Sequence, residues 1–177
     1  MKGTNTVIKK DLVLGIGNVD RQDDGVAWHI LSNLNRRLER PSPPTPDDEF
    51  EITGQSPDLR FVLQLTPDLS EDLSSYRRLC FVDAHTDQVN KDIQIVKVDS
   101  RFQSSPFTHH LTPASILAFT DSIYHRAPEA ALVSVRGYQF GFSRSLSTLT
   151  AQLAEQAADL IWKWLWEYTS DDLTSIP

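Results

Sequence analysis

The chain alternates between short apolar runs, typical of buried strands, and longer amphipathic runs, typical of helices. The first pair is DLVLGIG (11–17), read as a strand, and residues 23–40, read as a helix. Further strands are expected at 50–54, 59–65, 77–84, 92–98 and 130–137, and further helices at 66–76, 111–124 and 145–168. This alternation predicts an α/β fold, a three-layer α/β/α sandwich with a twisted, mostly parallel central sheet.

Several details of these elements can be predicted from residue type. Thr66–Pro67 and Thr112–Pro113 suit the cap and first position of a helix. The alternating run 92–98 suits an edge strand. In the helix at 23–40 the expected buried face carries Val26, Ile30, Leu34 and Leu38. In the last helix it carries Leu146, Leu149, Leu153, Ala157, Leu160 and Trp164.

The length of 177 residues fits a single domain over 1–177. Within it, the proline-rich stretch 41–49 is expected to be an exposed loop, and residues 169–177 a flexible C-terminal tail.

Charge and hydropathy exclude several classes of function. A formal net charge of −7 disfavours broad nucleic-acid binding, which needs a basic surface. No apolar run approaches the roughly 20 residues that cross a bilayer, and the first residues show no secretion signal. We therefore expect a cytoplasmic protein without a membrane partner. Cys80, the single cysteine, lies in an apolar run and is expected to be buried and unreactive.

The turn after the first strand combines glycines with carboxylates. Gly15 and Gly17 suggest a phosphate-binding turn, but Asp20 stands where a dinucleotide fingerprint has its third glycine. Asp23 and Asp24 follow, and negative charge there repels phosphate. The two carboxylates suit either a helix start, as capping residues, or a bound cation.

Other polar residues follow other strands. Asp83 ends the strand at 77–84, and His109 and His110 precede the helix at 111–124; His29 and His125 are read as structural. Ligands of open α/β sheets gather at the carboxyl ends of the strands. Asp24, Asp83 and one of the two adjacent histidines would therefore form an oxygen and nitrogen ligand set suited to zinc or nickel.

Five segments resemble the [NiFe]-hydrogenase maturation endopeptidases, in the order expected for that family. The glycine–asparagine turn with its Asp-Asp-Gly is at 13–26, the second acidic strand end at 81–87 and the histidine segment at 104–119. The remaining two segments are QLTPDLSEDL (64–73) and VRGYQFGFSRSLS (135–147).

The resemblance implies an α/β protease that removes a C-terminal peptide from the precursor of a hydrogenase large subunit after nickel insertion. The family's catalytic and metal-contacting positions carry over to Asp24, Asp83 and His109, the histidine two places before Leu111. The nickel would arrive in the precursor, zinc or a cadmium-like divalent ion could substitute for it, and no organic cofactor is implied. Asp23 or Asp24 would serve as the base.

The chain departs from the family pattern at several points. Asp24 stands where many members have glutamate, no glycine-rich GGT turn follows the second strand, and Leu63 stands where some relatives have histidine. Two other functions remain open on the sequence: an unrelated metal-dependent hydrolase with the same three ligands, and a noncatalytic hydrogenase-assembly chaperone.

Overall fold

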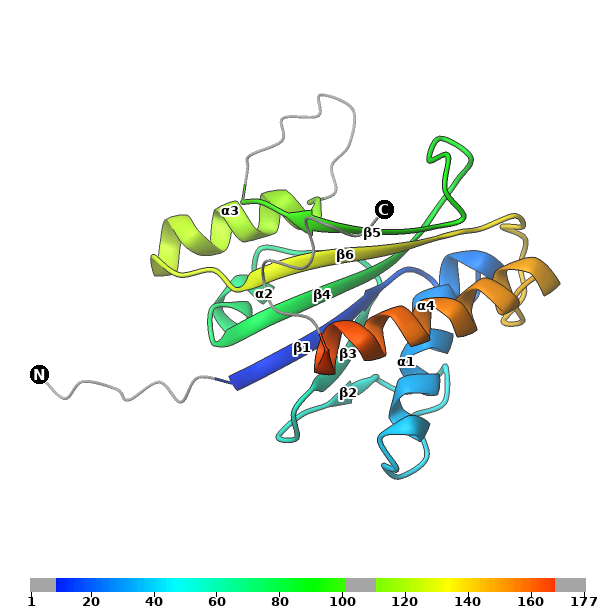
Figure 1. Cartoon of the computed structure of the whole chain (residues 1–177), viewed down its shortest axis with the longest axis horizontal. Helices are drawn as coiled ribbons and strands as arrows, with labels where there is room; N and C mark the ends of the chain where they lie inside the picture. Colours follow the sequence, from blue (N-terminus) through cyan, green and yellow to red (C-terminus); the bar gives the residue numbers. More distant parts are fainter. Residues whose placement is uncertain (1–8, 101–110, 168–177) are drawn as a thin grey trace, which may run out of the picture.

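A computed structural model describes residues 9–100 and 111–167. Figure 1 shows the arrangement of its elements. Their order along the chain is β1 (Lys9–Ile16), η1 (Gln22–Gly25, a 3-10 helix), α1 (Val26–Arg37), β2 (Glu51–Ile52), β3 (Asp58–Val62), α2 (Leu69–Leu73), β4 (Tyr76–His85), β5 (Ile93–Val98), α3 (Pro113–Tyr124), β6 (Glu129–Arg136) and α4 (Thr148–Trp166).

All six strands form one sheet, in the order β2-β3-β1-β4-β6-β5. The four inner strands are parallel, while β2 and β5 pair antiparallel with their neighbours at the two edges. The mostly parallel sheet and the edge position of β5 are therefore confirmed. Because β1 and β4 are adjacent and parallel, their carboxyl ends lie side by side (Figure 1).

Helices cover both faces of the sheet, which confirms the three-layer sandwich. Successive side chains of a strand point to opposite faces. Val13 and Cys80 therefore pack into the core formed with α1 and α4, whereas Leu12, Leu14 and Phe81 pack into the core formed with α2 and α3 (Figure 1).

The first helix packs as its four-residue spacing predicts. Val26, Ile30 and Leu34 are buried, and the neighbouring Leu38 packs partly buried against the same core. Gly15 allows this close approach. A Cβ at Gly15 would lie 3.0 Å from the side chain of Leu31, tighter than ordinary van der Waals contact.

The buried face of α4 agrees with the prediction in part: Ala157 and Trp164 are buried as expected. Leu149 is 54% exposed, and Leu153 and Leu160 are only partly buried. Small residues let α4 approach the sheet and α1 closely, so the prediction is wrong for Leu149 and overstates the burial of Leu153 and Leu160. The buried positions are Thr150, Ala154, Ala157, Ala158, Ile161, Trp164 and Leu165.

The two predicted helix starts have different outcomes. The side chain of Thr112 accepts a hydrogen bond from the backbone N–H of Ser115 (3.2 Å), and Pro113 is the first residue of α3, so this cap is confirmed. The helix start predicted at Thr66 is wrong. Residues 66–68 form a turn in which the carbonyl of Thr66 accepts from the N–H of Leu69, and α2 begins at Leu69.

Near the start of the inner strands, one arginine joins an aspartate of β1 to the end of α4. The side chain of Asp11, which is buried, accepts from the guanidinium of Arg78 at 2.7 and 3.0 Å. The same guanidinium donates to the carbonyls of Trp164 and Leu165. Arg78 therefore fixes the last turn of α4 to β4.

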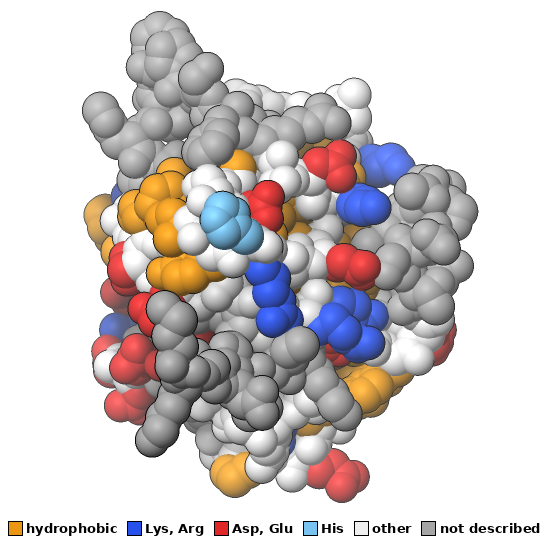
Figure 2. All heavy atoms as spheres, turned by 90° about the vertical axis from the view of Figure 1, so that its left-hand side faces the viewer, with side chains coloured by type: hydrophobic (Ala, Val, Ile, Leu, Met, Phe, Trp, Pro, Cys, Tyr) orange, Lys and Arg blue, Asp and Glu red, His pale blue; other side chains and the backbone are white. Residues whose placement is uncertain are grey.

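The surface at this end carries charges of both signs. Figure 2 shows the side of the molecule on which β1 begins. Basic side chains lie beside acidic ones on the described part of that face. Residues 41–49 contain no helix or strand, and the predicted tail 169–177 lies outside the described residues. None of the described helices has both the length and the apolar character needed to cross a membrane.

Candidate functional site

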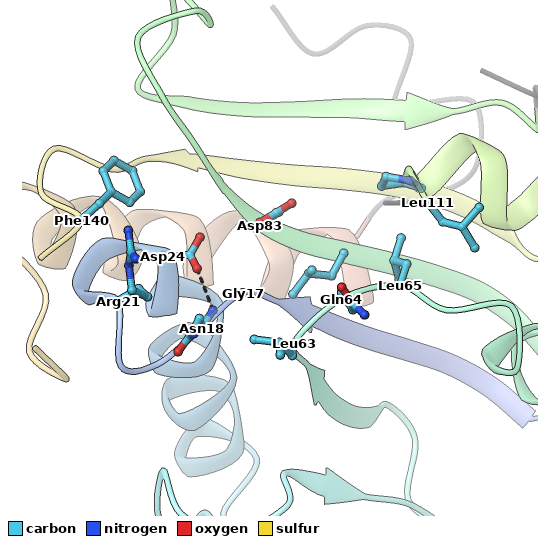
Figure 3. Close-up of a pocket in the computed structure, with 12 residues that line it drawn as sticks. Gly17, Asn18, Arg21, Asp24, Leu63, Gln64, Leu65, Asp83, Leu111 and Phe140 are labelled. Atoms are coloured by element: carbon cyan, nitrogen blue, oxygen red, sulfur yellow. Dashed lines mark hydrogen bonds between the residues drawn. The ribbon is translucent and has the colours of Figure 1, made fainter. Parts of the chain in front are cut away.

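Asp24 and Asp83 line the same cavity, at the carboxyl ends of β1 and β4 (Figure 3). Asp24 comes from η1, which follows β1, and Asp83 lies near the end of β4. The cavity has a volume of about 610 Å³. Its lining residues are Ile16, Gly17, Asn18, Arg21, Asp24, Leu63, Gln64, Leu65, Asp83, Leu111, Pro113 and Phe140.

A glycine turn brings Asp24 to the cavity. Gly17 has a φ of +142°, and a Cβ there would lie 2.0 Å from the carbonyl oxygen of Asp24. Only glycine fits this approach. The backbone N–H of Asn18 then donates to Oδ2 of Asp24 at 3.0 Å, which fixes the carboxylate against the turn (Figure 3). The glycine that suggested a phosphate site thus makes room for the backbone carbonyl of the aspartate whose side chain lines the cavity.

The Asp83 carboxyl group has a raised pKa, so it keeps its proton to a higher pH than an ordinary aspartate. Burial raises its pKa to about 7, the negative charge of Asp24 adds to this, and a hydrogen bond from the N–H of Ala84 (2.7 Å) opposes it. Burial also raises the pKa of Asp24, against the effects of the Asn18 N–H and the charge of Arg21. Neither carboxylate forms an ion pair with a described residue. Two carboxylates that share a cavity in this way favour a bound cation.

The predicted histidine ligands cannot be placed. His109 and His110 lie outside the described residues, and within the described part no cluster of three potential metal ligands occurs. Leu111 and Pro113, which follow them in the sequence, do line the cavity. The structure therefore brings together two of the three predicted residues, Asp24 and Asp83.

Asp23 does not cap the helix, which was one of the two roles left open for it by the sequence. The N-cap position of α1 is Gly25, and the Asp23 side chain is fully buried. It accepts five hydrogen bonds of 2.7–2.8 Å: from the N–H of Tyr138, Gln139 and Ser147 and from the hydroxyls of Ser147 and Thr150.

Those hydrogen bonds govern the charge of Asp23. Burial alone would raise its pKa, but the bonds from Ser147, Gln139 and Tyr138 outweigh burial and hold the pKa below its usual range. A buried carboxylate with both oxygens in use is a poor base. Of the two adjacent aspartates, Asp24 is the one that reaches the cavity.

The loop between β6 and α4 is part of the site, although residue patterns alone did not reveal it. Phe140 lines the cavity. Gln22 and Gln139 join the loop to η1 by a side-chain hydrogen bond of 2.8 Å, and the N–H of Gln22 donates to the carbonyl of Ser143. In the sequence, only the resemblance to the maturation endopeptidases marks the segment 135–147.

None of the three residues read as structural from the sequence, His29, His125 and Cys80, lines the cavity. His29 bonds through Nε2 to the carbonyl of Arg144, and His125 ends α3 with a φ of +51°. Burial raises the pKa of the Cys80 thiol to about 12, so it is not a thiolate at neutral pH.

The fold is similar to that of solved hydrogenase maturation proteases. The endopeptidase HybD from E. coli shares 18% identity over 90% of this chain and 93% of its own, with a TM-score of 0.62. The protease HycI from Thermococcus kodakarensis shares 17% identity over 88% of this chain and 92% of its own, with a TM-score of 0.60. The hydrogenase 2 maturation peptidase from a Thaumarchaeota archaeon shares 19% identity over 90% of this chain and 100% of its own, with a TM-score of 0.56.

No protein-family model and no curated protein matches the sequence. At identities below 20%, the likeness to the solved structures establishes a common fold. A common fold does not determine a function, which depends on the residues of the site.

Proposed function

We propose that this chain is a cytoplasmic endopeptidase that removes the C-terminal extension of a [NiFe]-hydrogenase large-subunit precursor after nickel insertion. It would recognise the nickel that the precursor carries. The observation that carries this proposal is the pair Asp24 and Asp83, two carboxylates in one cavity that have no ion-pair partner among the described residues.

The segments that resemble the maturation endopeptidases converge on this cavity. Asp24 comes from 13–26, Leu65 from 64–73, Asp83 from 81–87, Leu111 from 104–119 and Phe140 from 135–147, and all five line it. Five matches spread over more than 130 residues of sequence would not meet at one cavity by composition alone. Their convergence supports both the resemblance and the position of the site.

The donor set suits a nickel ion held in the substrate. In our proposal Asp24, Asp83 and His109 bind the nickel of the precursor and thereby place the scissile bond in the cavity. Zinc or a cadmium-like ion could occupy the same ligands, since carboxylate and imidazole accept any of these metals. No organic cofactor is required.

The chemistry is hydrolysis of one peptide bond. A water oxygen adds to the carbonyl carbon, the carbon–nitrogen bond breaks, and the leaving nitrogen takes a proton. A bound divalent metal polarises a carbonyl or activates water. Of Asp23 and Asp24, only Asp24 lines the cavity, and its Oδ1, which does not accept from the Asn18 N–H, is our candidate for the oxygen that takes the proton from water, with Oδ2 toward the metal. The Asp23 carboxylate is enclosed by its five hydrogen bonds. An acyl-enzyme route through Cys80 is disfavoured by the burial of its thiol.

The test is incubation of the purified protein with nickel-loaded and nickel-free precursor, followed by mass spectrometry. We expect loss of the C-terminal peptide from the nickel-loaded form alone. Asp83→Asn and His109→Ala should each abolish it. Asp87→Asn, which changes an exposed carboxylate after the same strand, is the matched control. Unchanged cleavage by either site variant would refute the assignment.

Two alternatives predict different results. A metal-dependent hydrolase of another kind, using the same ligands, would carry a stoichiometric metal of its own, which elemental analysis of the purified protein would detect. A noncatalytic assembly chaperone would bind the precursor with no change in the precursor's mass.

A further inference from the structure

Arg21 lies at the candidate site, and the N–H donors of its guanidinium are not used by any described residue. It lines the same cavity as Asp24 and Asp83 (Figure 3). Its guanidinium makes no hydrogen bond and no ion pair with a described residue. Arg144 in the facing loop is the opposite case, since it bonds Asp20 at 2.7 Å and Asp47 at 2.6 Å.

The backbone of Arg21 is held firmly. Its N–H donates to the carbonyl of Asn18 at 3.0 Å, and its carbonyl accepts from the N–H of Asp24 at 3.3 Å. It also forms a β-bridge with Ser143 of the β6–α4 loop. Arg21 therefore starts from a position fixed relative to Asp24.

The side chain of Arg21 is supported by an aromatic ring. Its guanidinium carbon lies 5.3 Å from the ring centroid of Phe142, within the range of a cation–π contact. Phe142 is 90% exposed, so its ring adds little to the core. The ring therefore offers the guanidinium a contact on its outer side, where both side chains are exposed.

Arg21 also acts electrostatically on the site. Burial raises the pKa of Asp24, while the Asn18 N–H and the positive charge of Arg21 lower it. Figure 3 draws Arg21 beside Asp24 and Phe140 at one end of the cavity, with Leu111 at the other. A free planar set of N–H donors thus lies beside the carboxylates to which we assign the chemistry.

We infer that Arg21 donates hydrogen bonds to the carbonyl oxygen of the peptide bond that is cleaved and stabilises the negative charge that develops there. This inference rests on the proposed function and names a residue that the resemblance did not assign. Phe142 is a positioning residue that holds the guanidinium in place.

The role of Arg21 follows from the electron movement in hydrolysis. When the water oxygen bonds to the carbonyl carbon, the π electrons of the carbonyl move onto its oxygen. They return when the carbon–nitrogen bond breaks and the nitrogen takes the proton. Donors fixed in advance around such an oxygen lower the barrier, and removal of one costs about 10²- to 10³-fold in kcat.

A second consequence concerns cation binding. A positive charge beside Asp24 weakens the attraction of the two carboxylates for a divalent ion. Removal of Arg21 should therefore tighten the binding of free zinc, by roughly two- to tenfold, while it slows cleavage. A variant that merely damaged the fold would weaken both.

The experiment compares wild type, Arg21→Ala, Arg21→Lys and Arg36→Ala. Arg36 is exposed near the end of α1, so its replacement removes the same charge away from the cavity. Precursor cleavage gives kcat and KM, and titration of the metal-free protein with zinc gives the affinity. We expect Arg21→Ala to lose about 100-fold or more in kcat and to bind zinc more tightly. Arg21→Lys should fall between it and wild type, because lysine keeps the charge but loses the planar fork.

Two further measurements separate Arg21 from its surroundings. Guanidinium ion at low concentration should partly restore cleavage by Arg21→Ala and leave wild type unchanged. Phe142→Leu should lower kcat less than Arg21→Ala does, and the double variant should be no slower than Arg21→Ala alone, because Phe142 acts through Arg21.

The outcomes distinguish this inference from the proposed function. If wild type cleaves and Arg21→Ala retains the wild-type kcat or the wild-type zinc affinity, the role of Arg21 is refuted and the function stands. If wild type cleaves no precursor, the proposed function fails, and the inference fails with it.

Discussion

Replacement of Asp83 by asparagine should stabilise the protein at neutral and alkaline pH. In the folded protein burial raises the pKa of Asp83 from its ordinary 3.8 to about 7, with the charge of Asp24 adding to the effect. A tenfold change in proton affinity is worth about 1.4 kcal/mol, so the ionised carboxylate costs the folded state at most about 4 kcal/mol. The side chain is only partly buried, and solvent reduces this cost to about 2–4 kcal/mol.

The effect has a defined pH range. The folded state binds the Asp83 proton more tightly than the unfolded chain, so stability falls as pH rises from about 4 to about 7. Below about pH 4 the side chain is protonated in both states and the cost is absent. Above about pH 7 it is ionised in both states and the cost is complete. Asparagine cannot ionise, and its Oδ1 can still accept from the Ala84 N–H as the carboxylate does at 2.7 Å.

The assay is urea unfolding of wild type and Asp83→Asn at several pH values between 4 and 8.5. We expect nearly equal free energies of unfolding at the acid end and a variant more stable by about 2–4 kcal/mol at the alkaline end. Asp87→Asn controls for the loss of one negative charge. A variant less stable than wild type at pH 8, or a difference that does not change with pH, would show that Asp83 is not strained by its burial.

Three other substitutions test the architecture around the site. Asp23→Ala leaves five hydrogen-bond donors without their acceptor and should lower the free energy of unfolding by at least about 3 kcal/mol in urea; a loss below about 1 kcal/mol would contradict the described network. Gly17→Ala places a Cβ 2.0 Å from the carbonyl oxygen of Asp24 and should cost about 1–3 kcal/mol in thermal unfolding and abolish precursor cleavage; a fully active variant would refute the tight turn. Tyr76→Phe removes the hydroxyl that donates to the buried Asp58 carboxylate at 2.7 Å and should cost about 1–3 kcal/mol at pH 7; equal stability would show that water replaces it.

The layers of the fold were predictable because they follow from local patterns. The four-residue spacing of Val26, Ile30 and Leu34 describes one helix face, and that face is buried in α1. The order of the strands was not predictable, since it depends on which distant segments pair. Nothing in residues 9–16 indicates that they lie between β3 and β4.

The predicted face of α4 was right for Ala157 and Trp164 and wrong for Leu149, and packing explains the difference. Prediction from hydrophobicity selects the largest side chains, such as Leu149. Burial in α4 instead follows close packing, which favours Ala154 and Ala158 where the helix approaches its neighbours.

The position of Asp24 and Asp83 in one site was predictable from the rule that ligands of open α/β sheets bind at the carboxyl ends of the strands. Asp24 and Asp83 each follow a parallel strand, and the carboxyl ends of such strands meet. The difference between Asp23 and Asp24 could not be read from the sequence. The difference arises because the backbone N–H groups of Tyr138, Gln139 and Ser147, more than 110 residues away, donate hydrogen bonds to Asp23.

The separation between Asp23 and its partners also predicts an order of assembly during synthesis. A nascent chain that has emerged only as far as β6 contains Asp24, Asp83 and the glycine turn, but not the donors at 138–150 that hold the Asp23 carboxylate. An unpaired charge of this kind resists burial. We therefore expect the segment bearing Asp23 and Asp24 to pack only after the start of α4 has been translated, and a ribosome-bound fragment ending before that point to expose these carboxylates to solvent.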